Sequence, residues 1–450
     1  MNSTIVPESG NLPGKRKSYW VHFLNTLVQA VRSQGSVLIL SIMVSLAWLF
    51  ISSIGGIGYK HFDSPIIDAR FWHIVNEPWP IWFDAEYLDI GEDKPFVFSL
   101  AYYLPAALVG KVFGWTAANL ALFCWAWLCL FVVFSLICIY ASLNVYRMGL
   151  LLLGIILFGG LDSAFNFVFK ITSDQSEMWS MPFFFFSNTR TLFWSPHHSL
   201  PIWLFGCTIL HLRSLSPRIL SLASISLVSV TLWSPLSLIS LLPFVVILLI
   251  YLVREHRSLI FSASTFVSIV LFSVLASFIL SNEFSFPLEW APHSFPNFWT
   301  KYPLFLLVEL GASILVILYG FKGLSPLERK LTIVSFLWLL LIPFVRLGLW
   351  SDWCIKNAIT PLFFLSIITG LIIVRSFRFR YFGILIVATL SISWLTAIEE
   401  INYSVRNFQI DFRNHPTFSQ FDKGYLIDQQ LGTPDSFFAK YLSRERKSNR

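Results

Sequence analysis

Residues 258–280 read SLIFSASTFVSIVLFSVLASFIL, a run without a single charged side chain. An apolar run of about 18 residues or more can cross the ~30 Å hydrocarbon core of a bilayer as an α-helix. Lipid offers no hydrogen bonds, so a backbone that crosses it must satisfy its own polar groups, as a helix does. Similar runs recur along the chain, beginning with SVLILSIMVSLAWLFISSIGG at 36–56. The sequence therefore predicts an all-α polytopic integral membrane protein.

The composition supports this fold class. Of the 450 residues, 56% are hydrophobic and 13% are charged, whereas a soluble domain is about 25% charged. The net charge of +7 does not imply a nucleic-acid partner, because most Lys and Arg lie in short loops between apolar runs, where they orient helices. Four of the five cysteines lie inside apolar runs, so neither a disulfide framework nor a metal-binding spacing is present.

We expect eleven membrane-spanning helices. Their approximate ranges are 36–56, 116–141, 147–163, 199–212, 217–234, 236–253, 258–280, 303–321, 331–349, 357–374 and 381–398. If residues 1–35 form a cytoplasmic tail, every basic cluster in a short loop falls on the cytoplasmic side, as the positive-inside rule requires. Residues 36–398 then form one transmembrane domain in the cytoplasmic (inner) membrane, and 399–450 form an outer tail.

The stretch FVFSLAYYLPAALVGKVFG at 96–114 is apolar enough to be a further crossing. A crossing here would invert all later loops and place the basic clusters outside. The stretch also contains Pro105 and Lys111. We therefore expect an interfacial or re-entrant helix on the outer side.

This topology gives three long outer segments, 57–115, 162–198 and 281–303. The tail, 399–450, is too short to bury much core by itself, so it is expected to pack on these segments. The cytoplasmic loops are too small to form a catalytic domain. Any chemistry is therefore expected on the outer face.

The first outer segment combines acids with tryptophans and prolines. Aromatic rings beside carboxylates suit sugar binding, because sugar faces stack on rings and hydroxyls bond carboxylates; the alternative is a belt of interfacial tryptophans. Asp63 and Asp68 come soonest after the first span and are candidate general bases. Either could instead cap a helix or pair with Arg70. Tyr102 and Tyr103 are candidate substrate-binding residues.

The second outer segment supplies five further candidates for substrate binding, which are Asp162, Glu177, Arg190, His197 and His198. Arginine and histidine near the lipid surface are suitable donors to a phosphate. Pro196 and Pro201 are expected to break the helix around the histidine pair and aim it at the cavity that holds Asp63 and Asp68. The alternative is a pair bonded to loop carbonyls. Zinc is not expected, because adjacent histidines are poorly placed to ligate one ion and no HExxH motif is present.

Arg346 lies close to the outer end of an apolar run, LLIPFVRLGLW, and an arginine in a membrane usually has an anionic partner. Lys356 follows, with Asp352 between them. Two cations that flank one acid could hold a lipid phosphate or pyrophosphate; alternatively, Arg346 extends to the lipid headgroups. Glu309, inside the eighth span, is expected to pair with a neighbouring helix.

The long acidic loop after the first span, with many helices and little soluble domain, resembles the GT-C-type membrane glycosyltransferases, such as protein O-mannosyltransferases and aminoarabinose transferases. FGGLD at 158–162, LFWSPHH at 192–198, WSPLSLISLLP at 233–243 and SDWCIKNAITP at 351–361 look like segments of a little-characterised bacterial branch. The resemblance implies an acid of the first outer loop as the catalytic residue, here Asp63 or Asp68, although no DD or DE motif follows the first span. It also implies that Arg346, Lys356 and His197 contact a lipid phosphate.

The predicted function is transfer of a sugar from a polyprenyl-phosphate donor to a glycan, lipid or protein acceptor at the outer face. The expected partners are this donor, the acceptor and membrane lipid, without nucleic acid. The sequence identifies no cofactor, although loop carboxylates could bind a divalent cation. The alternatives are a transporter or flippase of a lipid-linked saccharide, which should show inverted repeats or mid-membrane charges, and a polysaccharide polymerase or ligase.

Overall fold

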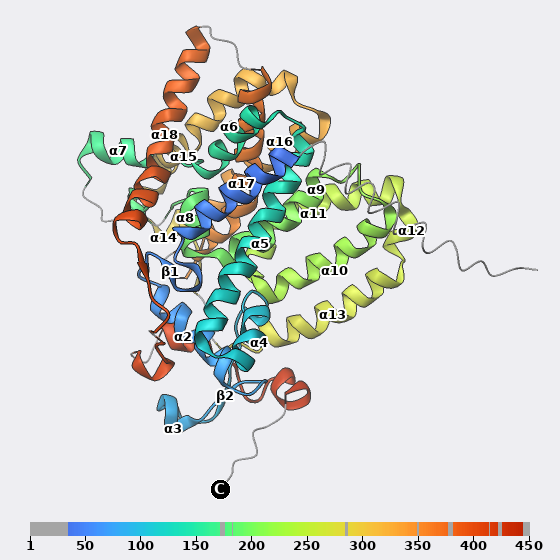
Figure 1. Ribbon diagram of the computed structural model, residues 1–450, viewed down its shortest axis with the longest axis vertical. Coiled ribbons are helices and arrows are strands. Elements are labelled where there is room, and N and C mark those ends of the chain that lie inside the picture. Colours follow the sequence, from blue (N-terminus) through green and yellow to red (C-terminus); the bar gives the residue numbers. More distant parts are fainter. Residues whose placement is uncertain are drawn as a thin grey trace, which may run out of the picture.

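The computed structural model describes residues 35–171, 176–181, 183–283, 287–348, 351–376, 381–413, 415–421 and 425–443. The predicted cytoplasmic tail, 1–35, lies almost wholly outside these residues. Helices dominate the described chain (Figure 1), and its strands form only short antiparallel pairs.

The first helix is Gly35–Phe50. The later helices are α2 (Ser64–Asn76), α3 (Ala85–Leu88), α4 (Leu104–Phe113), α5 (Trp115–Ala141), α6 (Val145–Ile156), α7 (Asp162–Phe169), α8 (Asn188–Trp194), α9 (Pro196–Leu210), α10 (Pro217–Trp233), α11 (Pro235–Glu255), α12 (Arg257–Ile260), α13 (Ala263–Ile279), α14 (Ala291–Ser294), α15 (Phe298–Gly320), α16 (Pro326–Leu341), α17 (Asp352–Ser376), α18 (Tyr381–Arg406) and α19 (Tyr425–Asp428). The strand pairs are β1 (Ile57–Gly58) with β6 (Gln409–Ile410), β2 (Trp82–Phe83) with β3 (Lys94–Pro95), and β4 (Leu288–Trp290) with β5 (Val345–Leu347).

Six helices of the described chain are long and apolar enough to cross a membrane. They are Trp115–Ala141, Pro235–Glu255, Arg257–Ile279, Phe298–Gly323, Asp352–Arg375 and Gly383–Arg406. The chain is therefore a helical, multi-pass membrane protein. Each of the eleven predicted ranges contains a helix, but several of these helices are short: α6 has 12 residues, about 18 Å at 1.5 Å per residue. The number eleven stays a prediction.

Helix α17 forms the centre of the bundle (Figure 1), and it packs against α16, α11, α6 and α9. Nearly all of its apolar stretch is buried, whereas that of α12–α13 is almost fully exposed at the edge of the molecule. A helix that is apolar all round is stable inside a bundle or against lipid. The two helices therefore represent the protein-facing and the lipid-facing extremes of this fold.

The stretch 96–114 forms helix α4 and the turn before α5. Helix α4 has 10 residues and is about 15 Å long, half of the ~30 Å that a crossing requires. The chain turns back at Gly114, which has a φ of 85°, and α4 then packs along α5. A short helix of this kind is what the prediction for 96–114 requires, while its position relative to the membrane stays a prediction.

Most of the first loop, with α2, α3 and β2, lies with the C-terminal segment at one end of the bundle, which we call the loop end (Figure 1). Here the C-terminal segment packs on the first loop, 57–115, as expected. Strand β6 pairs with β1, the Val97 amide donates to the Gln430 carbonyl at 2.9 Å, and the Thr433 amide donates to the Ser281 carbonyl at 2.8 Å. The tail nevertheless begins later than predicted, because α18 continues to Arg406 instead of ending at 398.

The contact between α4 and α5 gives a test of the fold. A Cβ added at Gly110 would lie 2.6 Å from the Ala118 Cβ and 2.8 Å from the Val75 Cγ1. Gly110→Ala should therefore push α4 away from α5 and destabilise the protein by about 1–3 kcal/mol, measured as a lower melting temperature in detergent.

The control for this variant is Gly154→Ala in α6. A Cβ at Gly154 meets no atom within 4 Å, and alanine favours a helix over glycine by about 1 kcal/mol. The melting temperature of this variant should be unchanged or higher. Equal melting temperatures for the two variants would contradict the close packing of α4 on α5.

Candidate functional site

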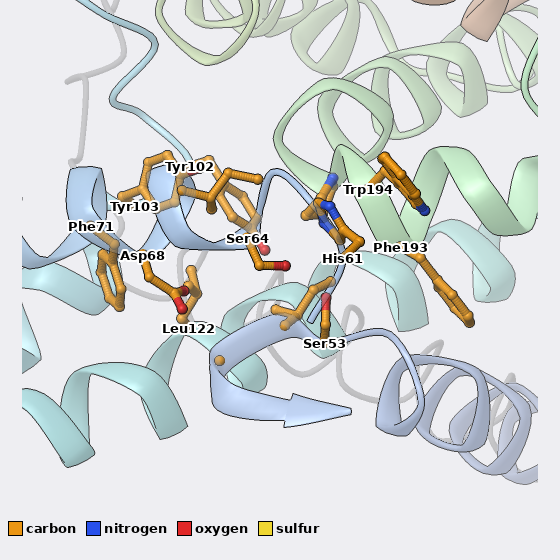
Figure 2. Close-up of a pocket in the computed structure, with 14 residues that line it drawn as sticks. Ser53, His61, Ser64, Asp68, Phe71, Tyr102, Tyr103, Leu122, Phe193 and Trp194 are labelled. Carbon is orange, nitrogen blue, oxygen red and sulfur yellow. The ribbon is translucent and has the colours of Figure 1, made fainter. Parts of the chain in front are cut away.

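A cavity opens at the loop end, where the first loop meets the junction of α8 and α9. It contains about 410 Å³ of space between protein atoms, part of it open to solvent. Its lining residues are Ser53, Ile54 and Gly55 after the first helix; His61, Ser64, Ile67, Asp68 and Phe71; Tyr102 and Tyr103 before α4; Leu122 of α5; and Phe193, Trp194 and Pro196. In Figure 2 the Ser64 side chain lies between the tyrosine pair on one side and His61 on the other. We call this space the loop-end cavity.

His61 joins the first loop to the α8–α9 junction. Its Nδ1 accepts a hydrogen bond from the Asp63 amide at 3.2 Å, and the ring also bonds the backbone of Phe193. The imidazole stacks on Trp194 with 4.5 Å between ring centroids. Burial, with the positive charge of Arg190, lowers the pKa of His61 to about 3. His61 is therefore a neutral structural clamp that fixes the backbone at Asp63.

Asp63 immediately precedes α2, and its side chain makes no capping bond to that helix. Burial raises the pKa of Asp63, and the nearby Asp352 adds to this effect, while Lys356, Arg70 and Arg190 oppose it. A half-buried carboxyl with a raised pKa, surrounded by cations, is typical of a group that exchanges a proton.

Asp68 lines the loop-end cavity, whereas Asp63 is not among the lining residues, and the two carboxyl groups have different environments. Its carboxylate pairs with Lys60 at 2.9 Å, and Lys60 also contacts Asp411 at 3.5 Å. Burial raises the pKa of Asp68, and Lys60 opposes the shift. Of the two predicted general bases, Asp68 therefore forms an ion pair with Lys60. Asp63 instead interacts electrostatically with Lys356, Arg70 and Arg190.

Both histidines of the adjacent pair are buried in protein. The Nδ1 of His198 and the Ser234 hydroxyl lie 2.5 Å apart, and the His197 ring lies 6.3 Å from Tyr102 and 6.1 Å from Tyr103, centroid to centroid. Lys356 and Arg70 act electrostatically on both imidazoles, as they do on Asp63. The pair therefore lies close to the tyrosines that line the loop-end cavity, but neither histidine is itself among the lining residues, so a cavity shared with Asp63 and Asp68 stays a prediction.

The expected proline break is only half right. Pro196 starts α9, but Pro201 lies inside that helix, which runs on to Leu210. Pro201 lies in the second turn of α9, so the helix loses the hydrogen bond that an amide there would donate to the His197 carbonyl, but it continues without a break. The two imidazoles are therefore held by a continuous helix rather than by a broken one.

Arg346 and Lys356 form separate ion pairs. Arg346 contacts Glu289 at 3.1 Å across the β4–β5 pair and lies over the Phe295 ring at 5.1 Å. Lys356 contacts Asp352 at 2.8 Å, one turn apart on α17. The predicted arrangement, with both cations around Asp352, is therefore replaced by two pairs, and only Lys356 belongs to the groups that act on Asp63.

Asp162, Glu177 and Arg190 lie in a second, buried cluster beside the cavity. Asp162 accepts from the Trp179 Nε1 at 2.7 Å, and Glu177 accepts from the Ser187 amide and hydroxyl at 3.0 and 2.7 Å. The Arg190 guanidinium lies 4.4 Å from the Trp194 ring and 4.7 Å from the Phe186 ring. This cluster positions the cavity wall at Trp194.

Glu309 belongs to the same cluster, as predicted for an acid that pairs with a neighbouring element. One of its carboxylate oxygens accepts from the Phe185 amide at 3.2 Å. A Cβ added at Gly160 would lie 2.5 Å from the Asp162 Oδ2 and 2.6 Å from the Glu309 Oε2. The two carboxyl groups therefore converge where only glycine fits.

Three residues around the cavity were missed by the sequence analysis in this role: His61, Ser64 and Arg70. Ser64, Asp68 and Phe71 are spaced i, i+4 and i+7, which places them on one face of α2, so the helical period could have identified Ser64. His61 and Arg70 carry no such pattern. Within the described ranges, no group of three or more His, Cys, Asp or Glu side chains is placed to hold a metal ion.

The titration of Glu177 gives a second prediction. Burial raises its pKa to about 8 despite the nearby Arg190, whereas a carboxyl in an unfolded chain has a pKa of about 4.3. The folded protein thus retains a proton that the unfolded chain releases, so stability should fall as the pH rises from about 5 to about 8. Glu177→Gln, which keeps one donor and one acceptor but cannot ionise, should show a smaller fall in melting temperature over this range.

Glu92→Gln is the matched control, because Glu92 is exposed, and it should keep the wild-type pH profile. If Glu177→Gln also kept that profile, the carboxyl of Glu177 would not carry the proton.

No protein-family model matches this chain, and no curated protein or solved structure matches it either.

Proposed function

We propose that the protein is a membrane glycosyltransferase that moves a sugar from a polyprenyl-phosphate donor to an acceptor at the outer face of the cytoplasmic membrane. The observation that carries this proposal is the environment of Asp63. It is a carboxyl with a raised pKa between His61 and Ser64, which line the loop-end cavity, and it lies within electrostatic reach of Lys356 and Arg70. A base next to cations suits a transfer in which a proton leaves the nucleophile while negative charge develops on a leaving phosphate.

The proposed reaction is a single displacement. The Asp63 carboxylate accepts the proton of an acceptor hydroxyl, and the acceptor oxygen forms a bond to the anomeric carbon of the sugar. The bond between that carbon and the phosphate oxygen breaks, and its electron pair stays on the phosphate. Arg70 and Lys356 stabilise the charge that develops there. No general acid is needed, because a phosphate monoester is released as an anion.

Aromatic side chains border the cavity, as expected for a site that contacts a sugar. Trp194, Tyr102 and Tyr103 all line it, and rings of this kind stack on the apolar faces of sugars while hydroxyl and carboxylate groups bond the sugar hydroxyls. In a transporter, by contrast, charges are expected near the middle of the spans. The ionisable groups around this cavity lie instead at the loop end, which supports transfer, whereas Glu309, near the middle of α15, is the one feature described above that a transporter would share.

The proposal predicts that Asp63→Asn abolishes transfer. Full-length protein in proteoliposomes would be given polyprenyl-phosphate sugars labelled in the sugar, together with a cell-envelope acceptor fraction, and label in the acceptor would be counted. Loss of a general base should lower the rate about 10²- to 10⁴-fold. Asp68→Asn should have a smaller effect, because Asp68 is paired with Lys60.

Glu92→Gln, an exposed acid of the same loop, is the control and should transfer at the wild-type rate. Undiminished transfer by Asp63→Asn would contradict the role of Asp63. If labelled donor crossed the membrane without reaching an acceptor, the protein would be a flippase; if the acceptor were extended by whole oligosaccharides, it would be a polymerase.

A further inference from the structure

The strongest unexplained feature of the molecule is the Arg70 guanidinium. Its side chain is 4% exposed, its Nε donates to the Gln430 amide oxygen at 3.0 Å, and its plane lies 3.6 Å from the Phe98 ring centroid. Its Nη1 has no hydrogen-bond partner among the described residues. Asp63 acts on it electrostatically without forming an ion pair. A buried cation without a paired anion is costly, so a negatively charged ligand beside Arg70 would stabilise it.

Three neutral polar atoms around the loop-end cavity are unpartnered in the same way. They are the Ser64 hydroxyl, the Tyr102 hydroxyl and the His197 Nδ1, each buried and each without a hydrogen bond in the described chain. Ser64 and Tyr102 line the loop-end cavity. Tyr103, which packs against both Tyr102 and His197, has its hydroxyl beside the Arg70 guanidinium. Unsatisfied buried groups are rare in folded proteins, and several together indicate a ligand or ordered water.

Water would satisfy the neutral groups but would leave the charge of Arg70 unbalanced. All four groups can donate a hydrogen bond, and one of them is a guanidinium, the side chain best suited to phosphate. Ser64 also begins α2, a helix of 13 residues, whose N-terminus carries partial positive charge. The set is therefore rich in donors and matches a ligand that only accepts hydrogen bonds.

We propose that Arg70, Ser64, Tyr102 and His197 form a binding site for a phosphate group in the loop-end cavity. The site binds the phosphate oxygens through the Arg70 Nη1, the two hydroxyls and the His197 Nδ1–H. This inference deepens the proposed function, since it rests on that function for the identity of the phosphate as leaving group. The ligand chemistry itself, a phosphate or phosphate monoester, follows from the donors alone and could come from a lipid headgroup or from free phosphate.

Binding would be measured with the purified full-length protein in detergent, at constant ionic strength, by titrating either inorganic phosphate or a polyprenyl monophosphate in mixed micelles. The uncharged polyprenol is the control ligand. Ser64→Ala and Tyr102→Phe should each weaken binding about tenfold, because each removes one hydrogen bond to a charged group. Neither variant breaks a side-chain hydrogen bond of the described protein, so both should fold.

Arg70→Lys keeps the charge but loses the planar fork, and it should weaken binding more than tenfold. Because Arg70 also holds Gln430, the melting temperature of this variant would be checked alongside. Arg329→Gln is the matched loss of an exposed arginine, whose guanidinium donates to the Lys322 carbonyl, and it should bind as the wild type does.

Binding of polyprenyl phosphate alone would identify a lipid headgroup, and binding of inorganic phosphate that competes with it would identify a site for free phosphate; both support the proposal. The proposal is overturned if neither ligand binds, if the polyprenol binds equally well, or if Ser64→Ala and Tyr102→Phe keep wild-type affinity. Asp63→Asn separates the two proposals, since it should bind phosphate but not transfer sugar. Phosphate binding without any transfer by the wild type would contradict the transferase and leave this site intact.

Discussion

The peptide backbone finds no water inside a bilayer, and this constraint determines where the rest of the structure can be irregular. The long apolar segments satisfy their backbone groups as helices. At the loop end the backbone groups outside helices bond between segments. The Val97 amide of the first loop donates to the tail, and the Gly432 amide of the tail donates to the first loop. Gln430 of the tail then accepts from Arg70 of α2, 360 residues away. The hydrogen bonds between the tail and the first loop therefore also position Gln430, which holds the Arg70 guanidinium of the proposed phosphate site.

Much of the fold follows from local sequence, because an apolar run specifies a buried or lipid-facing helix without reference to other segments. The positions of the helices were predictable for this reason, and so was the short helix within 96–114. The end of α18 was not. Its last two turns, to Arg406, contain EEINYSVR, which is polar but compatible with a helix, so the apolar run ends before the helix does.

The candidate site was predictable only in part. The acids of the first loop, the tyrosine pair and the histidine pair stand out in the sequence, because polar residues are rare in so apolar a chain. Their partners do not, since each partner lies far away along the chain. Arg346 was expected to share Asp352 with Lys356, but the β4–β5 pair brings it to Glu289 instead. His61 looked unremarkable because its role depends on Trp194 and on the Phe193 backbone.

Asp63 and Asp68, at the start of α2, are close in the sequence but differ in what their carboxyl groups contact. Asp68 holds Lys60, which also contacts Asp411 of the C-terminal segment, so its charge stabilises the contact between loop and tail. Burial raises the pKa of Asp68 as it does that of Asp63, but Lys60 opposes the rise and occupies the Asp68 carboxylate in an ion pair. Asp63 lies two residues after His61, whose Nδ1 accepts from the Asp63 amide. Its position is thus fixed through the backbone, and its carboxyl remains available to exchange a proton. Environment, rather than residue type, therefore separates the acid held in an ion pair from the one that we propose as the base.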